Sequence, residues 1–181
     1  MKHLTACLAL GLLAACGGPE RIVATPKLDA VQRTPSRFAS LEVIDVSLPA
    51  YAERNEITTT DGETLVVSDT LWADQPSRAM TLALTRHLSE ITGARVASEP
   101  WPFEDRSEAR LEVRVEELIV TGPTLRMTGQ YFVADREDRG RDHAHLFALT
   151  TPLADDGPAT IARARAQITL DLAATIAARG L

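Results

Sequence analysis

The alternation of apolar and polar residues predicts three strands in the first half of the chain. Residues 41–48 are rich in branched side chains and are typical of a strand. Pro49 ends this run, because proline has no amide hydrogen to donate to a neighbouring strand. Residues 56–60 and 63–67 flank the pair Asp61-Gly62, which favours the tight turn of a β-hairpin.

A second group of strands is predicted further along the chain. Residues 111–116 alternate strictly between apolar and charged side chains, so this strand has one buried and one solvated face. Residues 125–133 and 143–149 follow after polar loops and are also β-prone. Together the three predict an antiparallel meander, and a weak strand is expected near Val96.

Two helices are predicted, over residues 76–92 and 158–178. Pro76 stands in a first turn, where proline is favoured, and Gly93 suits the left-handed position after a helix end. Apolar residues recur at helical spacing on one face of each helix: Met80, Leu84, His87, Leu88 and Ile91 on the first, and Ile161, Ala164, Ile168, Leu172 and Ile176 on the second. The elements predict an α+β fold, a two-layer domain in which a mainly antiparallel β-sheet is packed by two amphipathic helices.

The second helix has another face made of small residues. Its members are Ala166, Leu170, Ala173, Ala174 and Ala177. Alanine is the best helix former, so propensity alone can account for this face. It can also be a contact surface with a neighbouring subunit. Both interpretations stay open, and with them a possible homo-oligomer.

The chain begins with a short apolar run that ends at a cysteine. The run follows the charged start Met1-Lys2-His3 and closes with Leu13-Ala14-Ala15-Cys16. This arrangement resembles a bacterial lipoprotein signal peptide over residues 1–15, with cleavage before Cys16 and acyl chains added to it. The run is too short for a spanning helix, which needs about 20 apolar residues. A plain secretory signal or a retained helix are the alternatives, and both leave the cysteine unexplained.

Removal of the signal would leave 166 of the 181 residues, which is enough for one domain. Residues 16–36 have little apolar periodicity and are expected to form the lipidated N-terminus and a flexible tether, with at most a short strand over 21–24. Residues 37–181 would form the domain. The net charge of −6 argues against nucleic acid as a partner. Because Cys7 lies in the signal, the domain keeps no thiol for a disulfide or a metal.

Motifs that carry catalysis are absent from the sequence. It has no nucleophile elbow, no phosphate-binding glycine loop and no H-E-x-x-H motif. His87 lies on an apolar helix face and is expected in the core. His143 and His145 share a strand face near Asp142, but a metal needs three or four converging ligands. We therefore expect no enzyme, no metal and no cofactor apart from the acyl or diacylglyceryl lipid on Cys16.

Several residues are candidates for docking a partner protein. The run 135–142 mixes both signs of charge at a predicted hairpin tip, which favours either a solvated loop or a docking loop. Trp72 is expected to anchor a loop to the core, whereas Trp101 could pack inside or dock a partner. The candidate docking residues are Trp101, Arg136, Arg139, Arg141 and Leu170.

The order and spacing of several segments resemble one family. They are Val46 to Ile57 with its Leu-Pro and Tyr, Leu71-Trp72-Ala73-Asp74 before a helix, Pro100-Trp101, and the strand Leu111 to Val115. Together with the cysteine signal, they resemble the PqiC-type family of ABC-type transport auxiliary lipoproteins. The resemblance covers about residues 16–133 and, more loosely, the last helix.

The resemblance implies a role without catalysis. Such proteins are expected on the periplasmic face of the outer membrane, where they work with an MCE-domain protein and inner-membrane ABC transporter components to move lipids. Gly17-Gly18 after the cysteine lacks the Asp that often retains lipoproteins at the inner membrane, which favours the outer one. The alternatives are an outer-membrane assembly lipoprotein that supports a β-barrel, and an anchored periplasmic hydrolase.

Overall fold

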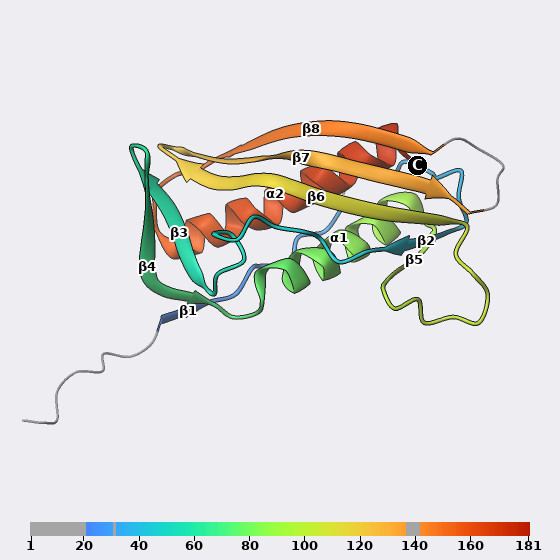
Figure 1. Cartoon of the computed structure of the whole chain (residues 1–181), viewed down its shortest axis with the longest axis horizontal. Coiled ribbons are helices and arrows are strands. Elements are labelled where there is room, and N and C mark those ends of the chain that lie inside the picture. The colour runs from blue at the N-terminus through green and yellow to red at the C-terminus, as the bar shows by residue number, and fades with distance from the viewer. Residues whose placement is uncertain (1–20, 31, 137–141) are drawn as a thin grey trace, which may run out of the picture.

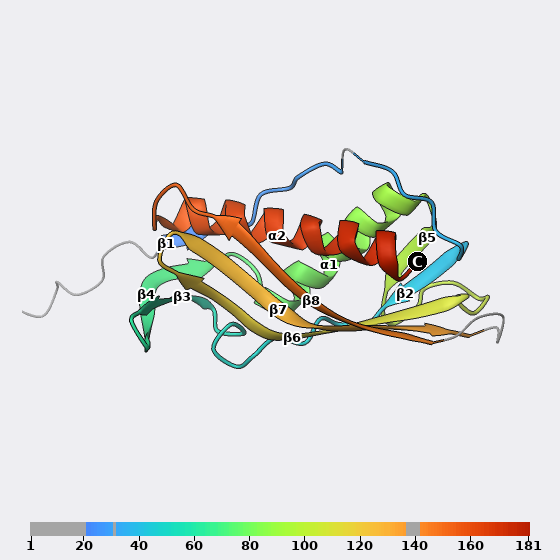
Figure 2. The same cartoon turned by 90° about the horizontal axis from the view of Figure 1, so that it is seen from above.

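Two β-sheets divide the strands of the protein between them, and two helices cover one face of the larger sheet (Figures 1 and 2). The computed structural model describes residues 21–30, 32–136 and 142–181. Its elements are β1 (Arg21–Val23), β2 (Ser40–Val43), β3 (Glu56–Asp61), β4 (Thr64–Trp72), α1 (Pro76–Thr92), β5 (Arg95–Ser98), β6 (Ala109–Thr121), β7 (Thr124–Asp135), β8 (His143–Pro152) and α2 (Pro158–Arg179). The predicted α+β class and both predicted helices are confirmed.

The larger sheet has the strand order β5-β2-β6-β7-β8. Its last three strands form the predicted antiparallel meander, and β5 confirms the weak strand near Val96. β2 runs parallel to both of its neighbours, which the sequence did not reveal. The register between β6 and β7 shifts between Val115 and Glu117, close to Gly129. A Cβ atom at Gly129 would lie 2.2 Å from the Arg114 carbonyl oxygen, so only glycine lets the two strands approach this closely.

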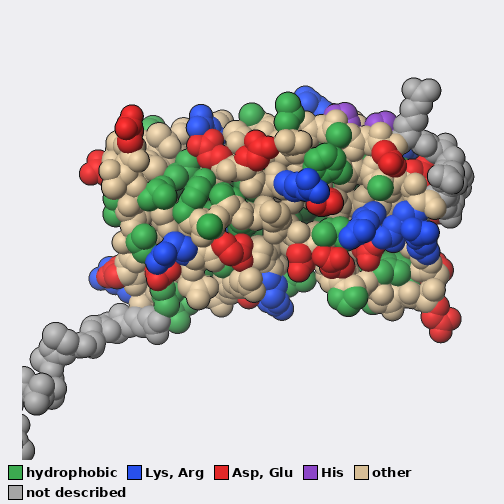
Figure 3. Space-filling view, in the orientation of Figure 1, with side chains coloured by type: hydrophobic (Ala, Val, Ile, Leu, Met, Phe, Trp, Pro, Cys, Tyr) green, Lys and Arg blue, Asp and Glu red, His purple; other side chains and the backbone are tan. Residues whose placement is uncertain are grey.

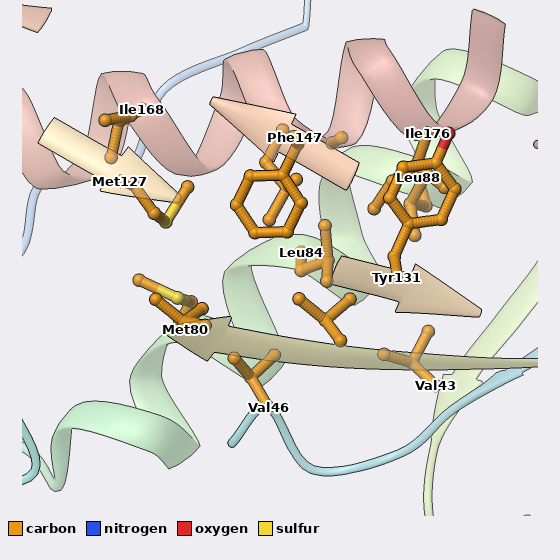
Figure 4. Close-up of a cluster of buried hydrophobic side chains, with 14 of the residues drawn as sticks. Val43, Val46, Met80, Leu84, Leu88, Met127, Tyr131, Phe147, Ile168 and Ile176 are labelled. Atoms are coloured by element: carbon orange, nitrogen blue, oxygen red, sulfur yellow. The ribbon is translucent and has the colours of Figure 1, made fainter. Parts of the chain in front are cut away.

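The hydrophobic core lies between this sheet and the two helices (Figure 4). Four side chains that point toward the sheet are 0% exposed: Leu84 and Leu88 of α1, and Ile168 and Ile176 of α2. The apolar stripe predicted on each helix is therefore the buried one. Three residues of the small-residue face of α2 are also buried within the chain itself: Ala166, Ala173 and Ala177. Their small size serves packing inside the protein, which corrects the expectation of a subunit interface at these three positions.

The smaller sheet has the order β1-β4-β3 and lies at one end of the molecule (Figures 1 and 2). β3 and β4 form the predicted hairpin, and Asp61 pairs with Thr64. The turn is therefore centred on Gly62 and Glu63, one residue later than predicted. Gly62 has φ of +59°, the left-handed conformation that glycine adopts without strain. A separate second sheet was not predicted.

The strand predicted over residues 41–48 is wrong in its second half, because β2 ends at Val43. Beyond it the backbone amides find partners outside a regular ladder. The Val46 amide donates to Thr81 Oγ1 of α1 at 2.9 Å, and the Asp45 amide donates to Glu99 Oε1 at 3.1 Å. The Ile44 and Ser47 amides still donate to carbonyls of β6, but between them side chains distant in the sequence replace the neighbouring strand, and no local pattern reveals them.

The flexible tether expected over residues 16–36 is wrong for its described part, residues 21–30 and 32–36. β1 pairs in parallel with β4, which confirms the short strand suggested there. The Thr34 amide donates to the Ile91 carbonyl at 2.9 Å. Ile91 lies in the last turn of α1, where carbonyls have no partner within the helix. The Glu90 carboxylate, which accepts from the Ala30 amide at 3.3 Å, also holds the segment to α1.

No helix in the described part of the chain is long and apolar enough to cross a membrane.

Candidate functional site

The smaller sheet exposes large apolar side chains. Ile22 of β1 is 62% exposed, and Leu65, Val66 and Val67 of β4 are 44–47% exposed. These four residues are called the apolar end here. β1 pairs with β4 only from Thr70 to Trp72. The four residues from Thr64 to Val67 are all exposed, so both faces of the first half of β4 meet solvent. Large apolar side chains gathered exposed on one small sheet are typical of an interaction site.

The β3–β4 hairpin is fixed to the larger sheet by one hydrogen bond, and the segment just before β3 is fixed to it by another. Thr60 Oγ1 donates to the Val120 carbonyl at 2.6 Å, and the Leu118 amide donates to the Tyr51 hydroxyl at 3.2 Å. Its position is therefore set by the core behind it. A rigidly held patch loses little conformational entropy when it meets a partner.

Trp72 and Arg165 meet where the smaller sheet joins the helices. The Arg165 guanidinium lies 4.6 Å from the centre of the Trp72 ring, and its Nη2 donates to the Pro76 carbonyl at 2.9 Å. Arg165 lies on the buried, apolar face of α2, and it is only 5% exposed although its side chain is charged. Burial lowers the pKa of Arg165 to about 10, so it is still protonated at neutral pH. The prediction that Trp72 packs against the core is confirmed.

Two cavities share the Trp72–Arg165 pair as a wall. One of about 350 Å³ lies between the segment 24–27, the end of β4 and α1. The other holds about 30 Å³ and lies between the β3–β4 hairpin and the ends of β6 and β7. Sequence analysis missed this pair. An arginine inside an apolar stripe, between Ala164 and Ile168, was the signal that could have drawn attention to it.

β8 is one of the two edge strands of the larger sheet, and β5 is the other. β8 contains no Asp, Glu, Lys or Arg, and its Leu146 is 74% exposed. Edge strands are usually protected by charges, bulges or prolines, and β8 pairs with β7 without any register shift. This edge is a second place where another polypeptide could pair.

Trp101 closes the loop that contains it. Its Nε1 donates to the Asp105 carbonyl at 2.6 Å, and its ring meets the Phe103 ring edge-on at 4.9 Å. The Arg95 guanidinium covers the Phe103 ring at 4.7 Å and also pairs with Asp105. Phe103 is 42% exposed, whereas Trp101 is half-buried. Trp101 is thus mainly a loop anchor, and Phe103 is the side chain that this loop presents.

Arg136 is not available for docking, which corrects that prediction. Its guanidinium pairs with Glu42 at 2.5 Å and donates to Ser107 Oγ at 2.8 Å. The two charged side chains are only 17% and 10% exposed. The pair joins the end of β7 to β2 across 94 residues of sequence, so its role is structural.

The other predicted site residues have different outcomes. Leu170 is half-buried and packs against the core, so only part of its side chain can meet a partner. Cys16, Arg139 and Arg141 lie outside the described residues.

The histidines do not form a metal site in the described residues, in which no group of three or more His, Cys, Asp or Glu converges. His143 and His145 stack with ring centres 6.0 Å apart. His87 lies in the core at 1% exposure, as predicted. Burial lowers the pKa of His87, and the neighbouring Arg86 lowers it further, while Glu90 at 3.6 Å opposes both.

The comparisons with known proteins agree with this architecture. A family model described as the ABC-type transport auxiliary lipoprotein component matches residues 23–177. The chain belongs to this family. The predicted resemblance is therefore confirmed. The auxiliary lipoprotein family is one of transport components and is not a known enzyme family. No curated protein matched the chain.

Two solved structures resemble this auxiliary lipoprotein. One, of an uncharacterized protein, is 20% identical with a TM-score of 0.71 and covers 88% of this chain and 97% of its own. The other is protein XCC0632 from Xanthomonas campestris, 18% identical with a TM-score of 0.68, covering 86% of this chain and 91% of its own. At these identities the likeness shows the fold.

Proposed function

We propose that this protein is a lipid-anchored subunit on the periplasmic face of the outer membrane, which docks the MCE-domain protein of an MCE/ABC-type lipid-transport system. The observation that carries the proposal is the family match over residues 23–177. The cysteine signal before the domain supports the anchor, and the apolar end supports docking. The role requires binding alone, and no step of it requires a catalytic group.

In this proposal, the lipid anchor at Cys16 lies close to the apolar end of the molecule. Only four residues lie between Cys16 and Arg21, the first residue of β1, so five residue-to-residue steps join the two. Five steps span at most about 18 Å when the chain is fully extended. An acylated Cys16 would therefore hold β1, and with it the smaller sheet, within about one bilayer leaflet of the membrane surface. A partner that reaches the outer membrane would meet this end of the molecule.

In-cell photo-crosslinking tests the proposal with Cys16 and its lipid intact. A photoreactive residue at Leu65 or Val67 should give a covalent adduct with the MCE-domain protein, because both side chains are exposed at the apolar end. The matched control is the same residue at Leu146, which is also apolar and exposed but lies on β8. Mass spectrometry of each adduct identifies the partner.

Two outcomes would contradict the proposal. Adducts with a β-barrel protein from the apolar end would favour the barrel-assembly alternative. Adducts with the MCE-domain protein from Leu146 alone would keep the transport system but move docking to the β8 edge. A Cys16→Ser variant should lose the adducts at Leu65 because the domain would no longer be held at the membrane.

A further inference from the structure

The larger cavity, of about 350 Å³, has the size and the walls of a ligand pocket. Its floor and sides are mostly apolar and come from Pro26, Trp72, Pro76, Leu82 and Ala83. They belong to three parts of the chain: the segment after β1, the end of β4 and the first half of α1. A cavity built from distant segments is set by the fold as a whole.

Positive charge gathers around this apolar cavity although the chain is acidic overall. Its lining includes Lys27, Arg86 and Arg165, against a single acid, Asp74. Asp74 is already paired with Arg78 through a short contact. Arg86 lies 3.6 Å from Glu90. The field inside the cavity is therefore positive, in a protein of net charge −6.

Arg165 is a buried cation with no counter-ion beside it in the described part of the chain. Among the described residues, no carboxylate lies within ion-pair distance of its guanidinium, which instead meets the Pro76 carbonyl and the Trp72 ring. The acid that acts on it from a distance is Glu53. Glu53 Oε1 is engaged by Gln75 at 3.0 Å and by Ser77 at 2.7 Å. A buried charge of this kind is costly unless an opposite charge compensates it.

We propose that this cavity binds a single-chain amphiphile with an anionic head, a carboxylate or a phosphate. The head pairs with the Arg165 guanidinium, and the hydrocarbon chain lies along Trp72 and Pro76 toward Leu82. Leu82 is 45% exposed, so it extends the apolar wall to the mouth of the cavity. The inference does not depend on the proposed function, because the isolated chain should bind the ligand without any transport partner.

Quenching of Trp72 fluorescence tests the proposal. The chain has two tryptophans, so Trp101→Phe leaves Trp72 as the only reporter. The full chain also carries Cys16→Ser, so that no acyl chain of its own can enter the cavity. Dibromostearate, whose bromine atoms quench tryptophan at short range, should then reduce the fluorescence saturably. Its uncharged methyl ester should bind at least about tenfold more weakly, because it cannot pair with Arg165.

Matched variants locate the site. Leu82→Glu places an anion at the mouth and should weaken binding about tenfold. Leu65→Glu makes the same change at a leucine that is also 45% exposed but lies away from the cavity, and it should bind as the parent does. Arg165→Gln should abolish binding, whereas Arg163→Gln, at an exposed position of the same helix, should not. If Arg165→Gln fails to fold by circular dichroism, Arg86→Gln replaces it, with a loss of about threefold.

Three results would overturn the inference. The first is equal binding of the methyl ester, which removes the need for an anionic head. The second is equal weakening by Leu65→Glu and Leu82→Glu, which moves binding away from the cavity. The third is displacement of dibromostearate by millimolar inorganic phosphate alone, which would assign the site to a free anion instead of an amphiphile.

Discussion

The two sheets of this protein use the same kinds of residue in opposite ways. Val113 and Val115 of the five-stranded sheet are at most 5% exposed, whereas Val66 and Val67 of the three-stranded sheet are at least 44% exposed. The difference comes from what covers them. Helices α1 and α2 close one face of the larger sheet, but the first half of β4 has no element over it (Figure 2). Burial of Val113 and Val115 therefore stabilises the folded protein, whereas Val66 and Val67 contribute little to its stability.

The surface of the molecule shows the same contrast. In Figure 3 apolar side chains gather over the end that carries β3 and β4, and charged side chains of both signs lie around this patch and along the rest of the face. The larger sheet pairs its exposed charges in place, as in Arg126 with Glu117 at 2.6 Å. The comparison predicts that substitutions in the two regions separate stability from partner binding.

The largest effect is expected from Leu172→Ala, beneath the larger sheet. Leu172 is 0% exposed, so its removal loses apolar burial and leaves a cavity. The free energy of unfolding should fall by about 3 kcal/mol, measured by urea denaturation. Leu146→Ala is the control, because that leucine is 74% exposed, and it should change the free energy by less than about 0.5 kcal/mol. Equal losses at both positions would contradict the contrast between buried and exposed residues.

A smaller loss is expected from Arg136→Leu, which leaves the Glu42 carboxylate largely buried without its partner. The free energy of unfolding should fall by about 2 kcal/mol. The double variant Arg136→Leu with Glu42→Leu should recover part of this loss, since no uncompensated charge then remains. A double variant as unstable as the sum of the two single ones would show that the pair is not coupled.

The next effect depends on pH and concerns His87. Because the pKa of His87 in the folded protein is lowered below 6.5, the unfolded chain takes up a proton first as the pH falls. Stability should therefore decrease as the pH drops from 6.5 through the lowered pKa, and it should not change from this cause above 6.5. His87→Gln should flatten this part of the melting-temperature profile between pH 7.5 and 5. An unchanged slope in the variant would assign the dependence to other groups.

The smallest change in stability is expected from Leu65→Ser combined with Val67→Ser. Both side chains are nearly half exposed, so each should alter the free energy of unfolding by no more than about 0.5 kcal/mol. The same variant should lose most of its co-purification with the MCE-domain protein. Stability that falls as far as in Leu172→Ala would show instead that the apolar end is part of the folding core.

The sequence predicted those elements whose pattern is local. Both helices and the meander follow from periodicity, and the αL position of Gly93, at φ of +72°, follows from its residue type. The early end of β2 could not be predicted, because it depends on a bond between Val46 and Thr81, 35 residues away. The ordered segment after β1 depends on carbonyls of α1 in the same way.

The candidate site was predicted less well than the fold. Charge made Arg136 look available, but Glu42 lies 94 residues away in the sequence and only the fold brings the two together. The exposure of Leu65 to Val67 contradicts their β-prone, apolar character, which alone predicts burial. For Arg165 the sequence suggests exposure, because a charged residue within an apolar stripe usually lies at the edge of the helix face, but the side chain is buried.

The parallel pairing of β1 with β4 has a mechanical consequence. Arg21, Ile22 and Val23 stand beside Thr70, Leu71 and Trp72 in the same direction, and β4 leads straight into α1. A pull on the chain ahead of Arg21 would act along the strands, so the ladder would be sheared as a unit rather than opened bond by bond. A force applied through a membrane anchor ahead of Arg21 would thus be transmitted to α1 at Trp72, and the tip of the β3–β4 hairpin would carry none of it.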